Sequence, residues 1–209
     1  MTSVRPLRQD AARNRERLVA AARDVFRRKG IEAPLEEIAR EAGVAIGTLY
    51  NRFPARGDLV DAALGPLAER GVEIAEQAAS ASDAWDSLAL FMEGTCELLA
   101  ADRGYSDVQR SRLAGTPVID VALKRSAALK AGIVARAKTA GVLRADVESA
   151  DLVLLIWGIA AVADATRDVA PDAWRRHLAL LLDGLRPGAA HRLPGPPLTF
   201  RQLRDTAPS

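Results

Sequence analysis

Apolar residues recur every three or four positions along the first part of the chain, which is the spacing of one buried face of an α-helix. The pattern predicts a first helix over residues 10–29 and leaves the polar residues 1–9 frayed. Gly30 follows the last position of the pattern, where glycine commonly ends a helix. The face expected to be buried consists of Leu18, Ala22, Val25 and Phe26.

Two short helices are predicted next, over residues 34–42 and 46–52. Pro34 suits the first turn of a helix, and Gly43 ends that helix. Pro54 ends the following one, because the residue before a proline avoids the helical conformation. Two short helices joined by a tight turn that contains glycine are typical of a helix-turn-helix unit.

The rest of the chain is also predicted to be helical, because no segment shows the sustained two-residue alternation of a half-buried strand. Further helices are expected over residues 56–79, 83–101, 105–113, 117–140, 147–169 and 171–185. The prediction is therefore an all-α protein of about nine helices, with a three-helix head (residues 1–55) and a larger helical body (residues 56–187). Residues 188–209 are rich in proline and are expected to form an extended or mobile tail.

Composition supports helices and limits the chemistry. Hydrophobic residues make up 49% of the 209 residues but aromatic ones only 4%, so the core must consist mainly of Ala, Leu and Val. Ala and Leu are strong helix formers. The single cysteine, Cys96, excludes an intrachain disulfide and a cysteine-cluster metal site, and it is expected to be a small core residue.

The net charge of +2 conceals an asymmetry along the chain. Residues 1–57 hold 12 Lys and Arg against 7 Asp and Glu, a balance of +5, whereas residues 58–209 have a balance of −3. A basic first quarter on an acidic remainder indicates a head that binds nucleic acid and a body with another task.

Signals for other classes of protein are missing. The sequence has no glycine-rich phosphate loop, no G-x-S-x-G elbow and no H-E-x-x-H motif, and the spacing of His177 and His191 does not suit a metal. The longest apolar run, residues 152–163, is shorter than the roughly 20 residues that span a membrane. We therefore expect no enzyme activity, no cofactor, no metal and no membrane contact, a buried helix around residues 152–163, and a cytoplasmic location.

The helix over residues 46–52 carries the chemistry of DNA recognition, since the second helix of such a unit enters the major groove. Leu49 and Phe53 lie four positions apart and are expected to face the core, so the residues beside them face outward. Tyr50 can hydrogen-bond phosphate, and Arg56, which opens the next helix, can hold the DNA backbone. The expected DNA-binding residues are Arg15, Arg17, Pro34, Ile46, Gly47, Thr48, Tyr50, Asn51, Arg52 and Arg56.

One set of residues over 15–59 has the order and spacing of a known family. It consists of Arg15-Glu16-Arg17-Leu18-Val19-Ala20-Ala21-Ala22, Phe26, Gly30, Glu37-Ile38-Ala39, Glu41-Ala42-Gly43-Val44, Gly47-Thr48-Leu49-Tyr50, Phe53-Pro54, Arg56 and Leu59. This stretch resembles the TetR family of transcriptional repressors. Ala33-Pro34, Ala45 and Arg52 depart from residues that the family often has there, which affects single DNA contacts and not the fold.

The resemblance implies a homodimer, in which the last two long helices of each subunit form a four-helix interface, and an effector pocket in each body. The expected interface residues are Gly158, Ala161, Leu178, Leu181, Leu182 and Leu185. The expected pocket residues are Trp85, Leu88, Phe91, Met92, Thr95, Tyr105 and Trp157, each of which also suits an ordinary core. A buried central helix in a monomer is the alternative to the dimer.

The sequence thus predicts a DNA-binding transcriptional regulator, most often a repressor, that binds a palindromic operator in double-stranded DNA. An unknown small-molecule effector is expected to release it. The alternative is a helix-turn-helix regulator controlled by protein partners without a small ligand. A cavity of several hundred Å³ in the body would favour the small ligand, and a fully packed body would favour the protein partner.

Overall fold

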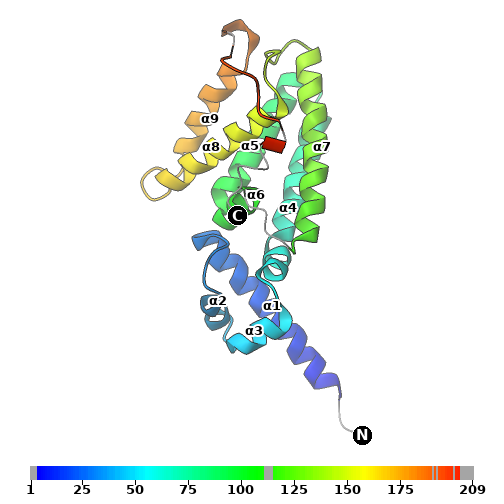
Figure 1. The fold of residues 1–209 in the computed structure, drawn as a ribbon, viewed down its shortest axis with the longest axis vertical. Helices are drawn as coiled ribbons and strands as arrows, with labels where there is room; N and C mark the ends of the chain where they lie inside the picture. The colour runs from blue at the N-terminus through cyan, green and yellow to red at the C-terminus, as the bar shows by residue number, and fades with distance from the viewer. Residues whose placement is uncertain (1–3, 111–114, 190, 192, 200, 203–209) are drawn as a thin grey trace.

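The structure is a computed structural model that describes residues 4–110, 115–189, 191, 193–199 and 201–202. Within these residues it contains nine α-helices, one 3₁₀ turn and no strand, so the predicted all-α fold is confirmed (Figure 1). The elements are α1 (Val4–Lys29), α2 (Leu35–Glu41), α3 (Ile46–Arg52), α4 (Arg56–Ser80), α5 (Ala84–Ala101), α6 (Arg103–Arg110), α7 (Pro117–Thr139), α8 (Ser149–Thr166), α9 (Ala173–Gly184) and η1 (Pro187–Ala189).

Two helices begin earlier in the structure than the sequence predicts. Helix α1 begins at Val4, because Pro6 falls in its first turn, where a missing N–H costs no hydrogen bond. Residues 4–9 are therefore helical and not frayed, while residues 1–3 lie outside the described part. Helix α6 begins earlier than expected because the Asp102 carboxylate accepts the Tyr105 amide N–H at 2.9 Å. The expected continuation over residues 111–113 also lies outside the described part.

The head, α1 to α3, packs around a small apolar core. Leu18, Phe26, Ile38 and Leu49 are all fully buried there. Two ion pairs fasten α1 to α2, Arg28 with Glu41 and Lys29 with Glu37, each at 2.8 Å. The hydrogen bond from Lys29 lowers the pKa of the Glu37 carboxyl.

The body is built from two helix pairs joined through α5. Helices α4 and α7 lie side by side on one edge of the molecule, and α8 and α9 pair on the other (Figure 1). Helix α5 packs against all four of them. At Gly94 of α5 a Cβ atom would lie 2.6 Å from a methyl group of Ile74 in α4, so this helix pair approaches closely because the residue is glycine.

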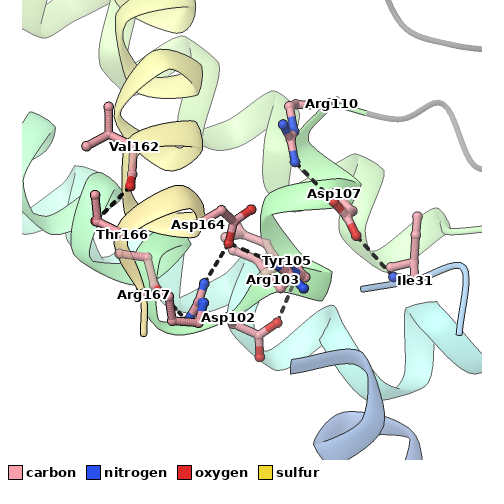
Figure 2. A network of polar contacts seen from close by, with 11 residues as sticks. Ile31, Asp102, Arg103, Tyr105, Asp107, Arg110, Val162, Asp164, Thr166 and Arg167 are labelled. Carbon is pink, nitrogen blue, oxygen red and sulfur yellow. Dashed lines mark hydrogen bonds and ion pairs between the residues drawn. The ribbon is translucent and has the colours of Figure 1, made fainter. Parts of the chain in front are cut away.

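Helix α6 joins the head to the body. The amide N–H of Ile31, in the loop after α1, donates to Asp107 of α6 at 3.2 Å, and Gly104 of α6 lies directly against the backbone of Phe26 in α1. The first residue of α6 also reaches α8, where Arg103 lies 3.6 Å from Asp164 (Figure 2). Head, α6 and α8 thus form one continuous series of contacts.

The start of the proline-rich tail is attached to the turn between α7 and α8. Arg144 in that turn donates to the carbonyl of His191, and Asp146 accepts the amide N–H of Leu193 at 3.3 Å. The hydrogen bond from Arg144 lowers the pKa of Asp146 to about 2. Residues 193–199 contain no helix, and the segment is held to the body at its beginning.

Candidate nucleic-acid interface

Helix α3 presents one face to solvent because the opposite face is anchored in the core of the head. Leu49 is fully buried and Phe53 is 3% exposed, as their spacing predicts. Tyr50, next to Leu49, is 48% exposed. Asn51 and Arg52 are also exposed. The phenol of Tyr50, the amide of Asn51 and the guanidinium of Arg52 therefore all lie on the exposed side of α3.

The first turn of α3 is equally accessible. Gly47 is exposed, and a Cβ added there would meet no atom within 4 Å. Ile46 and Thr48 on either side are half-buried. Gly47 therefore allows another backbone to approach α3 closely.

Pro34, just before α2, is exposed and leaves that helix without a side-chain cap.

Two arginines of α1 flank α3. The Arg15 guanidinium lies 5.5 Å from the centre of the Phe53 ring, at the end of α3. Arg17 donates to the carbonyl of Gly43, in the turn before α3, with a donor–acceptor distance of 3.5 Å. Both side chains are exposed. Together with Arg52 they surround the outer face of α3 with positive charge, which suits a polyanion.

Arg56, which was expected to contact the DNA backbone, binds carbonyl groups of its own chain in the structure. Its Nη1 atom donates to the carbonyls of Ile31 and Ala33, at 2.5 and 2.8 Å. Arg56 is half-buried in this position and closes the loop between α1 and α2. Arg56 therefore helps to position the head through Nη1, and its expected contact with phosphate stays a prediction.

Sequence reasoning missed the contacts that orient the head. Arg28 and Glu41 are 13 residues apart with a loop between them, and Ile31 and Asp107 are 76 residues apart. Neither spacing is a helical one, so no periodicity in the sequence could reveal the pairs. The only local signal was the concentration of basic residues in the last turn of α1, which contains Arg28 and Lys29.

In the part of the chain that the structure describes, the expected effector residues line neither of two hollows on the body. Leu88, Phe91, Met92 and Tyr105 are buried among other apolar side chains. Trp85, Thr95 and Trp157 are half-buried. A hollow of about 590 Å³ lies instead between α4 and α5, and another of about 340 Å³ lies beside α7.

The expected interface residues separate into two groups. Gly158 and Ala161 of α8 are exposed. Leu178, Leu182 and Leu185 are buried in the core of their own chain, and Leu181 is half-buried and packs against that core. The leucine stripe of α9 is thus used inside the protomer, and the large apolar residue that α9 exposes is Leu180, at 61%.

Helix α8 is not a buried helix, in contrast to the sequence prediction. By length and composition it would be long and apolar enough to cross a membrane, but only 33% of it is buried. Its outer stripe consists of Leu154, Gly158, Ala161 and Ala165. The inner stripe packs against α5 and α9, so an apolar surface remains on the outside.

The body offers little other site chemistry. Cys96 is buried, and this burial raises the pKa of its thiol to about 12, which keeps the thiol protonated. Among the described residues there is no group of three His, Cys, Asp or Glu side chains that could hold a metal ion. The exposed face of α3 remains the strongest candidate site.

Comparison with known families finds two matches, one in the first part of the chain and one in the body. Residues 18–63 match the family described as "Bacterial regulatory proteins, tetR family". Residues 83–187 match "Transcriptional regulator SbtR-like, C-terminal domain". The first match covers the second half of α1, all of α2 and α3, and the first turns of α4, and the second match covers α5 to α9.

Individual relatives agree with these matches. A TetR transcriptional regulator of Streptomyces coelicolor is 31% identical, with a TM-score of 0.54, over 84% of this chain and 99% of that one. An HTH-type transcriptional regulator of Staphylococcus aureus is 39% identical over 54 residues, which are 25% of this chain and 29% of that protein's length. FadR of Bacillus subtilis, solved in complex with stearoyl-CoA, covers 84% of this chain and 99% of its own at a TM-score of 0.63, and at 20% identity it shows the fold alone. The chain therefore belongs to the TetR family and is a DNA-binding transcriptional regulator.

Proposed function

We propose that this protein is a repressor that binds a palindromic operator as a homodimer, in the cytoplasm, and leaves the operator when a small molecule binds the body. The observation that carries the proposal is the exposed face of α3 with arginines around it. Tyr50, Asn51 and Arg52 stand outward there, while Leu49 and Phe53 hold the helix to the head.

Each exposed residue has a role that follows from its chemistry. Tyr50 and Thr48 hydrogen-bond phosphate oxygens, and Asn51 reads a base edge or binds phosphate. Arg15, Arg17 and Arg52 neutralise phosphates, and the open backbone at Gly47 lets α3 lie deep in the major groove. Pro34 and Ile46 border this face.

The dimer is supported by the outer surface of α8 and α9. Leu154 on α8 is 38% exposed and Leu180 on α9 is 61% exposed. Gly158 and Ala161 on α8 are exposed and small, which permits close packing of a second helix. A two-fold pair of chains meeting here forms a four-helix interface, with each protomer contributing α8 and α9.

Two heads are what a palindromic operator requires. Half-sites in adjacent major grooves lie about 34–36 Å apart, and a dimer with that separation of its α3 helices binds both at once. DNase I footprinting of the DNA upstream of the gene tests this. We expect two protected half-sites related by a palindrome, and a single unsymmetrical footprint would contradict the dimeric repressor.

A matched pair of substitutions tests the interface separately. Leu180→Glu places a charge on the proposed interface, whereas Val121→Glu changes a residue of α7 that is exposed to a similar extent, 55%. The first variant should sediment as a monomer and lose the footprint, and the second should behave as the wild type. A dimeric Leu180→Glu protein would show that the interface lies elsewhere.

Control by a small molecule is supported by the space in the body. The hollow between α4 and α5 has a volume of about 590 Å³, which is in the range of ligand sites. Because α4 and α6 also contact the head, a ligand that favours another arrangement of the body shifts the distance between the two heads. A near-complete switch needs about 10⁴-fold preference for the released form.

A further inference from the structure

The hollow between α4 and α5 is lined mainly by apolar residues. They are Ile74 and Ala78 of α4 and Leu90, Gly94, Leu98 and Ala101 of α5. The volume of about 590 Å³ lies within the roughly 300–1,000 Å³ of ligand sites. The hollow can therefore hold the apolar body of a small molecule.

Three charged side chains also line this hollow, and two of them are neutralised within the chain. Arg70 pairs with Glu73, one turn further along α4, at 2.7 Å. Glu97 of α5 pairs with Arg175 of α9 at 2.6 Å. Glu93 makes no hydrogen bond or ion pair with any residue that the structure describes. The charge that the hollow offers to a ligand is therefore a carboxylate.

We propose that this hollow binds an amphipathic cation, a molecule with an apolar body and one ammonium group. The ammonium donates hydrogen bonds to the carboxylate of Glu93, and the apolar body rests on Leu90 and Leu98. Glu97, one helical turn after Glu93, lies on the same face of α5. The lining contains two glutamates and one arginine, so its charge of −1 attracts a cation and opposes an anionic ligand.

The position of the hollow connects it to the head. It lies along the second half of α4, from Arg70 to Ala78, and α4 begins at Arg56 directly after the head. A cation held between α4 and α5 favours one arrangement of these two helices. Any arrangement that differs between the DNA-bound and released forms is thereby biased. This inference rests on the proposed function and specifies the chemical class of its effector.

Calorimetric titration of the full chain with probes that share one skeleton tests the chemical class. The probes are diphenylpropylamine, diphenylpropanol and diphenylpropionate, which at neutral pH are a cation, a neutral molecule and an anion. We expect the amine to bind at least about five-fold more tightly than the alcohol, and the acid to bind most weakly. Equal affinity for amine and alcohol, tighter binding of the acid than of the alcohol, or no binding of the amine overturns the inference.

Two variants separate the charge from the apolar wall. Glu93→Gln keeps the shape of an exposed side chain and removes its charge, so it should weaken the amine at least about five-fold and leave the alcohol unchanged. Leu90→Ala removes apolar surface at an exposed position, so it should weaken amine and alcohol by the same factor. Asp86→Asn makes the same change of charge at an exposed position of α5 outside the hollow, and this control should bind the amine normally. An Asp86 variant that binds the amine as weakly as the Glu93 variant would overturn the site.

Footprinting with the same protein keeps this inference distinct from the proposed function. Amine affinity that is unchanged in Glu93→Gln overturns the cation site even where the wild type protects a palindrome, and the repressor then stands without it. Binding that needs Glu93, in a protein that protects no palindrome, supports the site and overturns the repressor. Amine that binds through Glu93 and also removes the footprint supports both.

Discussion

The arginines of the head and those of the body are used differently. Around α3, Arg15, Arg17 and Arg52 are exposed and make no ion pair with any residue that the structure describes. In the body, by contrast, Arg125 pairs with Glu69 at 2.9 Å and Arg175 with Glu97 at 2.6 Å. Positive charge is therefore left available on the face that we propose binds DNA, whereas these two arginines of the body are neutralised within the chain, which composition alone does not reveal.

The two regions also differ in how completely they bury apolar residues. Among residues 12–55 of the head, whose exposure the structure describes, the large apolar residue that is most exposed is Tyr50, which has a proposed role on DNA. The body exposes Leu154 and Leu180 on α8 and α9, Leu90 on α5, and Val118 and Val121 on α7. The exposed apolar residues of α8 and α9 are those that we propose form the dimer interface, whereas apolar residues exposed singly on the other helices need no partner.

The largest expected effect distinguishes the inner and outer sides of α3. Leu49→Ala should lower the free energy of unfolding of the head by about 2–5 kcal/mol, because it leaves a cavity in a fully packed core. Tyr50→Ala should change it by no more than about 0.5 kcal/mol and abolish operator binding. Thermal melts and gel shifts of both variants measure this, and a strongly destabilised Tyr50 variant would reverse the assignment of the two sides.

The next effect comes from a charge inside the body. Burial of Lys130 in α7 lowers the pKa of its ammonium from 10.5 to about 8. The unfolded chain keeps the ordinary pKa and binds more protons between pH 8 and 10.5, so the free energy of unfolding rises with pH over this window. Lys130→Met should remove that rise. Urea unfolding at several pH values checks this, and an unchanged pH profile would contradict it.

Two arginines of the head provide a third comparison. Arg56→Ala removes the hydrogen bonds to Ile31 and Ala33 and should destabilise the head by about 1.5–3 kcal/mol. Arg52→Ala should leave the free energy of unfolding unchanged and weaken binding to all DNA sequences alike. The slope of log affinity against log salt should become shallower by about the amount that one phosphate contact contributes. An Arg56 variant with full stability and weak DNA binding would restore the phosphate role expected from sequence.

The smallest effect concerns the joint between head and body. Asp107→Ala removes the acceptor for the Ile31 amide N–H and should cost about 1 kcal/mol locally. Hydrogen exchange at that amide should then become roughly five-fold faster while the melting temperature of the core changes little. Unchanged exchange at Ile31 would show that this contact does not hold the head.

Much of the head could be predicted because its signals are local. The bounds of α3 match the prediction, since Pro54 ends the helix within the sequence that forms it. The partners of Arg56 could not be predicted, because they are carbonyls of a loop that only the folded head brings near. The family resemblance identified the fold and the task, and the placement of single side chains had to come from the structure.

The body was harder to predict because its helices are apolar on more than one face. On α9 the stripe of Leu178, Leu182 and Leu185 was assigned to the dimer, yet these side chains complete the core of the protomer. Periodicity shows that a face is apolar but not what covers it. For the same reason Met92 and Tyr105 suited a pocket in the sequence and are packed in the structure.

One measurement tests the central claim, that the outer face of α3 gives this regulator its specific hold on DNA. Fluorescence anisotropy would compare the wild type and Tyr50→Ala on the DNA upstream of the gene and on scrambled DNA, over a series of salt concentrations. The wild type should bind its own site at least about 10³-fold more tightly than scrambled DNA, and its log affinity should fall linearly with log salt. The folded Tyr50 variant should lose binding to its own site. Equal affinity of the wild type for both DNAs, or a folded variant with full specific affinity, would contradict the account.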